Sequence, residues 1–128
     1  MHWRCVGNIL GKIGYHVSIS EGLDGAVKYS SSIGCETMQI FLSSPRMWSM
    51  QKISSENIKR FINKKIELKI NPVFVHMPYL PNLASSNNDI YSKSLKTFSE
   101  TIIECQKLDI EYVVVHLGSY LNSTKEEF

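Results

Sequence analysis

The sequence predicts an α/β protein in which four successive strand–helix units build one parallel sheet. Short runs rich in β-branched residues alternate with longer stretches of helical spacing, which is the pattern of repeated βα units. The run at residues 73–75 is apolar without a break, as in a strand that is covered on both faces. Right-handed crossovers between parallel strands then allow either an open doubly wound sheet or part of a βα barrel.

The first unit begins shortly after the N-terminus. Its strand is predicted over residues 13–18, and its helix runs from about residue 21 to residue 33. Gly34 follows as the C-terminal cap, because glycine readily adopts the left-handed conformation in which many helices end.

The second unit pairs a strand over residues 37–42 with a helix that begins after Ser54. Serine is a favoured N-cap, and Glu56 in the first turn suits the positive end of the helix dipole. Lys64 and Lys65 suit the negative end, so we expect this helix to end near Lys65. Its apolar stripe is formed by Ile58, Phe61 and Ile62.

The third unit begins after the Asn-Pro pair at residues 71–72, which breaks the chain ahead of a strand over residues 73–76. An amphipathic helix of about five turns follows and ends near Leu108, since apolar residues recur at steps of four and three. These residues are Tyr91, Leu95, Phe98, Ile102 and Cys105. A fourth strand over residues 112–116 comes directly afterwards.

The chain ends soon after the fourth strand. Its 128 residues are about half of the roughly 250 that a closed eight-stranded βα barrel needs. Residues 122–127 resemble the start of another helix, with Ser123 or Thr124 as its cap. We therefore expect the natural protein to continue past Phe128, and we interpret residues 1–11 as an extension ahead of the first strand.

The composition excludes several classes of protein. With 43% hydrophobic and 20% charged residues, the chain is neither disordered nor fibrous, and no apolar run approaches the roughly 18–20 residues of a membrane span. Three widely spaced cysteines without a C-x-x-C pair argue against a disulfide framework and against a thiolate zinc site. We therefore expect a cytoplasmic protein, or a nuclear one in a eukaryote, with no membrane association.

Basic residues are concentrated between Arg46 and Val75, although the net charge of the whole chain is only +2. That segment holds seven Lys and Arg against two Glu. It forms either a solvated helix face rich in lysine, which is the simpler interpretation, or a surface that faces a polyanion. The charge alone does not predict a nucleic-acid-binding protein.

Three of the four predicted strands carry a histidine at or near their carboxyl end, namely His16, His76 and His116. Ligands of parallel sheets bind at the carboxyl ends of strands, and neutral imidazoles on rigid elements are common ligands of zinc. One such histidine is usually a hydrogen-bonded structural residue, but three along one edge favour a site. No carboxylate stands at a metal-ligand spacing from them, so carboxylate ligands would have to come from beyond Phe128.

Four motifs lie in order at the ends of the four predicted strands. They are GYHVSISEGL at residues 14–23, QIFLSSPRMW at 39–48, VHMPYLPNLAS at 75–85 and VHLGS at 115–119. With these motifs the chain resembles the N-terminal half of an apurinic/apyrimidinic endonuclease of the endonuclease IV family. The resemblance implies a (βα)8 TIM barrel, of which residues 12–128 form about the first four βα units.

The resemblance also implies an activity. Members of this family hydrolyse the phosphodiester 5′ to an abasic site in double-stranded DNA during base-excision repair, with three Zn2+ ions held in the complete barrel. His76 and His116 are then zinc ligands, and His16 is a catalytic residue at the same edge. Because this segment could hold at most one zinc in part, we expect it to be inactive alone and the complete barrel to act as a monomer.

Contacts to DNA are implied for four residues of the motif loops, which are Arg46, Tyr79, Leu80 and Asn82. A wedge of Tyr79 and Leu80 can fill the gap at an abasic site, where stacking is already lost. Two neighbouring polar or aromatic residues have structural alternatives. Asn82 could cap its own backbone in a turn, and Trp48 could pack as the anchor of its loop.

Two other functions remain open from the sequence alone. A metal-dependent sugar isomerase or epimerase on a related barrel would place metal ligands at the same strand ends, but a small sugar needs no protruding arginine or Tyr-Leu wedge. A non-catalytic fragment that binds damaged DNA would prefer abasic over intact duplex without cutting it.

Overall fold

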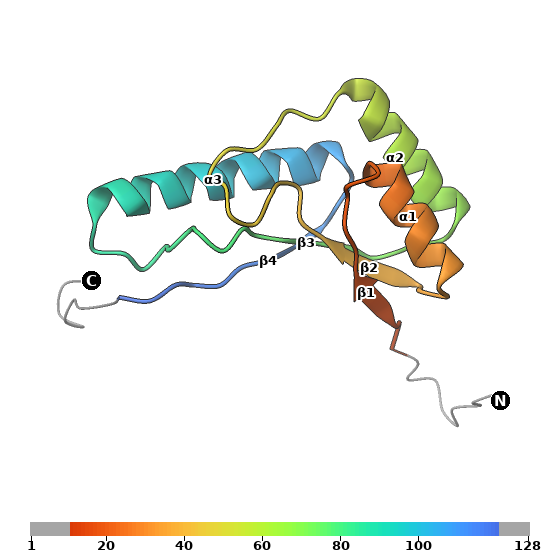
Figure 1. The fold of residues 1–128 in the computed structure, drawn as a ribbon, viewed down its shortest axis with the longest axis horizontal. Helices are drawn as coiled ribbons and strands as arrows, with labels where there is room; N and C mark the ends of the chain where they lie inside the picture. The colour runs from red at the N-terminus through yellow and green to blue at the C-terminus, as the bar shows by residue number, and fades with distance from the viewer. Residues whose placement is uncertain (1–10, 121–128) are drawn as a thin grey trace.

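The computed structural model describes residues 11–120, and within them strands and helices alternate along the chain (Figure 1). In chain order the elements are β1 (Gly14–His16), α1 (Leu23–Ser32), β2 (Thr37–Ile40), α2 (Ser55–Glu67), β3 (Val73–His76), α3 (Asn88–Lys107) and β4 (Tyr112–Val114). The strands pair in parallel in the order β1-β2-β3-β4. This order has no reversal, as in a βα barrel, whereas a doubly wound sheet reverses at a switch point. The predicted α/β class is confirmed.

The helices lie on one face of the sheet, as Figure 1 shows, and the core lies between the two layers. Successive side chains of a strand point to opposite faces, so only alternate residues enter that core. Core residues of the strands and of the first two helices are Met38, Ile40, Val73, Val75, Val27 and Phe61. The register places His16, Gln39 and Phe74 side by side on the other face, which lines the interior in a closed barrel.

The helix ends follow the predicted signals. Gly34 has a φ of 81° directly after the C-cap of α1, which confirms its role. The Ser54 side chain accepts a hydrogen bond from the Asn57 N–H at 3.2 Å, so the predicted N-cap of α2 is confirmed as well. The helix α2 ends at Glu67, slightly beyond the predicted end. Lys65, in the last turn of α2, is buried, and the ammonium group of Lys65 pairs with the carboxylate of Asp109.

The helix α3 begins earlier than the apolar spacing predicted. Its N-cap is Asn87, whose side-chain oxygen accepts hydrogen bonds from the N–H groups of Asp89 at 3.0 Å and Ile90 at 3.1 Å. The predicted apolar stripe is not the face that packs on the sheet at this end of the helix. Tyr91 is 44% exposed and Leu95 is 46% exposed in the described part of the chain.

Small hydroxyl residues form much of the buried face of α3 instead. Ser94, Thr97 and Thr101 are buried, and each hydroxyl donates to the carbonyl four residues earlier in the helix. Their polar groups are therefore satisfied without water. A stripe search that counts apolar residues misses such a face near the start of the helix, whereas the predicted Cys105 is buried in the core toward the other end.

Some predictions extend past what the structure describes or past the strands it contains. The helix start at residues 122–127 and the extension before residue 11 lie outside the described residues. The predicted strands at 13–18 and 112–116 are shorter in the structure, so His116 falls beyond the end of β4. Between residues 11 and 120, no helix is long and apolar enough to cross a membrane.

Candidate functional site

The three predicted histidines gather at the carboxyl ends of the strands, an edge of the sheet that we call the rim. His16 ends β1, His76 ends β3, and His116 follows β4. The Nε2 atoms of His76 and His116 are 3.3 Å apart. The ring of His16 lies farther away, with its centroid 6.1 Å from that of His76. Two of the three histidines thus form a close pair, and the third lies beside it.

The histidine pair has the geometry of two ligands of one metal ion. Two imidazole nitrogens bound at about 2.0–2.1 Å to a tetrahedral zinc ion lie about 3.3–3.4 Å apart. The Nδ1–H of His76 donates to the Met77 carbonyl at 2.6 Å, so in the neutral ring Nε2 carries the lone pair that a metal ion would need. Among residues 11–120, however, no group of three or more His, Cys, Asp and Glu side chains is arranged to hold a metal ion. The pair fits part of a zinc site.

His16 is held as a neutral imidazole. The side-chain amide of Gln39 donates to its Nδ1 at 2.9 Å, so the ring proton is on Nε2. Burial lowers the pKa of His16, and the nearby His76 lowers it further. Its Nε2 is buried and has no hydrogen-bond partner within the described chain. His16 therefore holds a buried N–H donor that has no partner among the described residues, next to the histidine pair.

Phe41 completes the rim directly after β2, one residue beyond Ile40, which pairs with Val75 just before His76. Its ring centroid lies 4.5 Å from that of His16 and 5.0 Å from that of His76. Tyr79 packs edge-on against the same ring, with 5.4 Å between centroids. Phe41 was not among the predicted site residues, although its place at the end of the predicted second strand would have located it. Its ring contacts both His16 and His76 and so links these two imidazoles at the rim.

The loops after β2 and β3 carry the predicted DNA contacts. Tyr79 is 63% exposed and Leu80 is 38% exposed, and Arg46 is also exposed. The Tyr79 N–H donates to the Pro45 carbonyl at 2.9 Å, so the two loops are joined where these side chains project. Exposure of a Tyr-Leu pair beside the histidine pair is the arrangement that the wedge hypothesis needs.

Asn82 and Trp48 have structural partners in these loops. The Oδ1 atom of Asn82 accepts a hydrogen bond from the Ala84 N–H at 3.1 Å, so Asn82 caps its own backbone, as the alternative interpretation predicts. Its amide also binds Ser119 in the loop after β4. Trp48 is half-buried, and its carbonyl accepts a hydrogen bond from the Thr97 hydroxyl at 3.3 Å, which ties this loop to α3.

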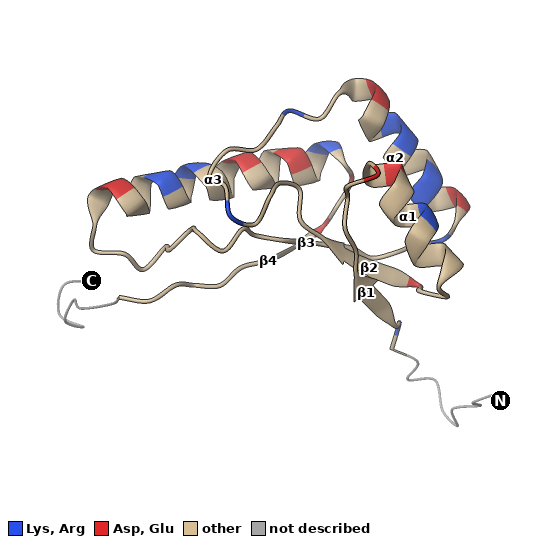
Figure 2. Ribbon diagram, viewed as in Figure 1, with Lys and Arg blue, Asp and Glu red and all other residues tan. Residues whose placement is uncertain are grey.

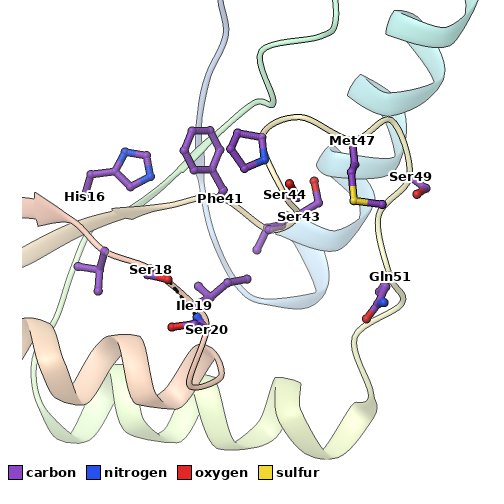
Figure 3. Close-up of a pocket in the computed structure, with 13 residues that line it drawn as sticks. His16, Ser18, Ile19, Ser20, Phe41, Ser43, Ser44, Met47, Ser49 and Gln51 are labelled. Atoms are coloured by element: carbon purple, nitrogen blue, oxygen red, sulfur yellow. Dashed lines mark hydrogen bonds between the residues drawn. The ribbon is translucent and has the colours of Figure 1, made fainter.

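A cavity of about 750 Å³ opens beside His16, between the loops after β1 and β2 (Figure 3). Its polar lining consists largely of serine hydroxyls, from Ser18, Ser20, Ser43, Ser44 and Ser49. Within the described residues, no Asp, Glu, Lys or Arg lines it. The cavity is therefore a neutral, hydroxyl-rich space next to the rim.

The predicted basic segment lies mainly on α2, away from the rim. In Figure 2 the basic residues of α2, drawn in blue, lie beside acidic residues of α1 and α2, drawn in red. Arg60 pairs with Glu56 at 3.8 Å and with Asp24 at 4.0 Å, and Lys64 pairs with Glu67 at 2.6 Å. The basic residues of α2 therefore fit the simpler of the two interpretations, a solvated helix face with local ion pairs. Arg46 differs, since it projects from a rim loop.

Known proteins are similar to this chain in sequence and in fold. Residues 27–128 match a family described as xylose isomerase-like TIM barrels. The probable endonuclease 4 of Cenarchaeum symbiosum (strain A) is 42% identical over 118 residues, which are 91% of this chain and 42% of that protein. Endonuclease IV from Thermus thermophilus has a similar structure, with a TM-score of 0.78 at 30% identity over 84% of this chain and 41% of that one.

A D-psicose 3-epimerase solved in the presence of D-fructose is a more distant neighbour. Its TM-score is 0.59 at 12% identity, over 79% of this chain and 36% of that chain, and this likeness shows the fold alone. The chain spans about two fifths of the length of the curated relatives it matches. The resemblance to endonuclease IV drawn from the four motifs is confirmed by these similarities. The chain belongs to the xylose isomerase-like TIM barrel family.

Proposed function

We propose that this chain is the N-terminal half of a zinc-dependent apurinic/apyrimidinic endonuclease of base-excision repair. The complete enzyme hydrolyses the phosphodiester 5′ to an abasic site in double-stranded DNA. In this proposal residues 12–128 supply about four βα units of the barrel, residues 1–11 are an extension, and the segment alone is inactive. The similarity to proteins named endonuclease 4 supports a hydrolase of the nuclease type.

The observation that carries the proposal is the histidine pair beside an exposed aromatic wedge. His76 and His116 bring their Nε2 atoms to 3.3 Å, the separation of two ligands on one zinc ion. Tyr79 lies next to this pair, with its ring centroid 5.7 Å from that of His76. A sugar epimerase could use the histidine pair to bind a metal ion, but it needs no exposed Tyr-Leu wedge beside that pair.

Each rim residue has a role that its contacts allow. His76 and His116 hold one zinc of the three-zinc cluster, and the later part of the barrel supplies the remaining ligands. When bound, such a cluster lowers the pKa of the attacking water and neutralises charge on the reacting oxygens. His16, neutral and with a free Nε2–H, donates to an oxygen of the phosphodiester and so orients it. Phe41 links His16 and His76 through its ring contacts with both.

The loops recognise the lesion. Tyr79 and Leu80 enter the gap left by the missing base, which costs less than unstacking an intact pair. Arg46 contacts the backbone of the same duplex, since a guanidinium group binds phosphate oxygens with two parallel hydrogen bonds. Asn82 supports these contacts from below the loop surface. The partner is therefore damaged duplex DNA, met in the cytoplasm or in a eukaryotic nucleus, and the complete barrel acts as a monomer.

Incision of a defined lesion tests the proposal. The complete natural protein is incubated with an end-labelled duplex that contains a single abasic analogue, and the products are sized on a denaturing gel. We expect one cut, 5′ to the lesion, that disappears after treatment with a chelator and returns with added zinc. The intact duplex of the same sequence serves as the control and stays uncut.

Two results would contradict this function in different ways. Selective binding of the abasic duplex without any cut, in zinc-loaded protein, would identify a damage-binding protein instead. Metal-dependent interconversion of ketoses with no preference for the abasic duplex would identify an epimerase. Either result replaces the endonuclease proposal.

A further inference from the structure

His116 lies outside the hydrogen-bonding of the sheet. The last residue of β4 in register with β3 is Val114, which pairs with His76, and the Met77 N–H donates to the Val114 carbonyl at 3.0 Å. Among the described strands no ladder bond follows at His116, which is exposed. A metal ligand tolerates only small displacements, of about 0.5 Å, so contacts beyond the β3–β4 ladder matter for the position of this residue.

The loop that carries His116 is held by Asn82, which lies in the loop after β3. The Nδ2 group of Asn82 donates to the Ser119 carbonyl at 2.7 Å, and its Oδ1 accepts from the Ser119 N–H at 3.0 Å. Both ends of one amide therefore bind the backbone of one residue. His116 thus sits on a short span that is fixed at Val114 by the sheet and at Ser119 by this amide.

Asn82 is itself anchored to a buried part of the molecule. Its backbone N–H donates to the Ser94 hydroxyl at 2.8 Å, and that hydroxyl donates to the Ile90 carbonyl of α3 at 2.6 Å. Ser94 has no solvent exposure. Asn82 is therefore anchored to α3 through its backbone, and its side-chain amide in turn holds the loop after β4.

Gly118 makes this close approach possible. Its φ is 99°, a backbone conformation that side chains with a Cβ rarely adopt. A Cβ on Gly118 would also lie 2.1 Å from Oδ1 of Asn82, well inside contact distance. The glycine stands between His116 and Ser119, where any larger residue would push the amide away.

We propose that Asn82 is a positioning residue that acts through His116 to keep the histidine pair at metal-binding distance, with Gly118 as the residue that admits it. This inference rests on the proposed metal site. Asn82 touches neither metal nor DNA in this role. It influences how tightly the metal is held, because its two hydrogen bonds to Ser119 help the loop after β4 to keep His116 opposite His76.

Metal retention in the complete protein tests this role. We expect Asn82→Ala to release zinc to a chromogenic chelator on the order of 10-fold faster than the wild type, as supporting contacts of metal ligands usually do when removed. Asn82→Asp keeps the acceptor but loses the donor to Ser119, so its release rate should lie between the two. In cobalt-loaded protein the visible absorption bands should shift with Asn82→Ala, since they report the ligand geometry.

Asn87→Ala is the matched control. Asn87 lies in the same loop and also uses its side chain to bind backbone N–H groups, but those belong to α3 and not to the His116 loop. It should lower the melting temperature to a similar degree while zinc release and the cobalt spectrum stay unchanged. Equal zinc release from wild type, Asn82→Ala and Asn82→Asp would overturn the positioning role and leave the proposed function intact. A wild type that binds no zinc would overturn both.

Discussion

The backbone N–H of Tyr79 donates to the carbonyl of Pro45 at 2.9 Å, which joins the loop after β3 to the loop after β2. Arg46 follows one partner of this bond, and Leu80 follows the other. Side chains far apart in the sequence are thereby held on one surface of the rim. Because the joining bond is between backbones, these side chains can be removed without breaking it, and the predictions that follow use this property.

The exposed wedge should determine affinity for the lesion. Replacing Tyr79 and Leu80 together by alanine in the complete protein should weaken binding to an abasic duplex by about 1–3 kcal/mol, since base-sized stacking contacts are worth that much. Zinc content should not change, because neither side chain is a ligand. Fluorescence anisotropy with abasic and intact duplexes measures the effect.

Ile66→Ala is the control for this wedge. Ile66 is an apolar side chain that is 67% exposed, but it lies near the C-terminal end of α2, at the opposite edge of the sheet. It should leave binding of both duplexes unchanged. Wild-type affinity of the Tyr79 and Leu80 double variant for the abasic duplex would remove the wedge from the proposal.

Arg46 should contribute through phosphate contact rather than through recognition of the lesion. Arg46→Ala should therefore weaken binding to abasic and intact duplexes alike and reduce the slope of log K against log salt concentration by about 1. Lys64→Ala makes a suitable comparison, because Lys64 is paired with Glu67 on α2 and lies away from the rim. A salt slope that is the same in Arg46→Ala and the wild type would exclude the phosphate contact.

The extent to which the sequence predicted this protein depended on the kind of signal. Local signals worked at Gly34 and Ser54, because a positive φ and an N-cap are each set by one residue and its neighbours. The motif order predicted the parallel sheet and its barrel order. The buried face of α3 was predicted correctly at Cys105 but wrongly near the start of the helix, because Ser94 and Thr97 bury hydroxyls that are satisfied inside the helix and carry no hydrophobic signal.

The site was predictable in its ligand types but not in its supports. His16, His76 and His116 were found because each lies at or just after the carboxyl end of a strand, and parallel strands bring such positions to one side of the sheet. The contacts that orient them join residues that are distant in the chain, such as Gln39 with His16. Whether two such residues meet depends on how the elements pack, and the spacing of residues along the sequence does not show this.

Protonation of His16 should oppose folding. Its pKa in the folded protein is lowered, first by burial and then by His76, so the folded state binds fewer protons than the unfolded state. The contribution to stability is then present above the ordinary histidine pKa and is lost as pH falls from there through the lowered folded pKa. Urea unfolding of chelator-treated complete protein should show a steeper loss of stability on acidification in the wild type than in His16→Gln. Parallel pH profiles for the two proteins would contradict this assignment.

The last prediction concerns the histidine pair and distinguishes the roles of the three rim histidines. His116→Ala should weaken zinc binding by at least about 10-fold and abolish incision with it, since the Nε2 atom that faces His76 at 3.3 Å is removed. His16→Gln is the matched histidine variant at the same edge, and it should keep full zinc content because the His16 Nδ1 is occupied by Gln39 and its ring lies outside the pair. Zinc content by elemental analysis after dialysis distinguishes them. Full zinc in His116→Ala would contradict the ligand role of His116, because removing a ligand must lower the affinity for the metal. Loss of zinc in His16→Gln would contradict the role of His16 as a neighbour of the pair that does not bind the metal.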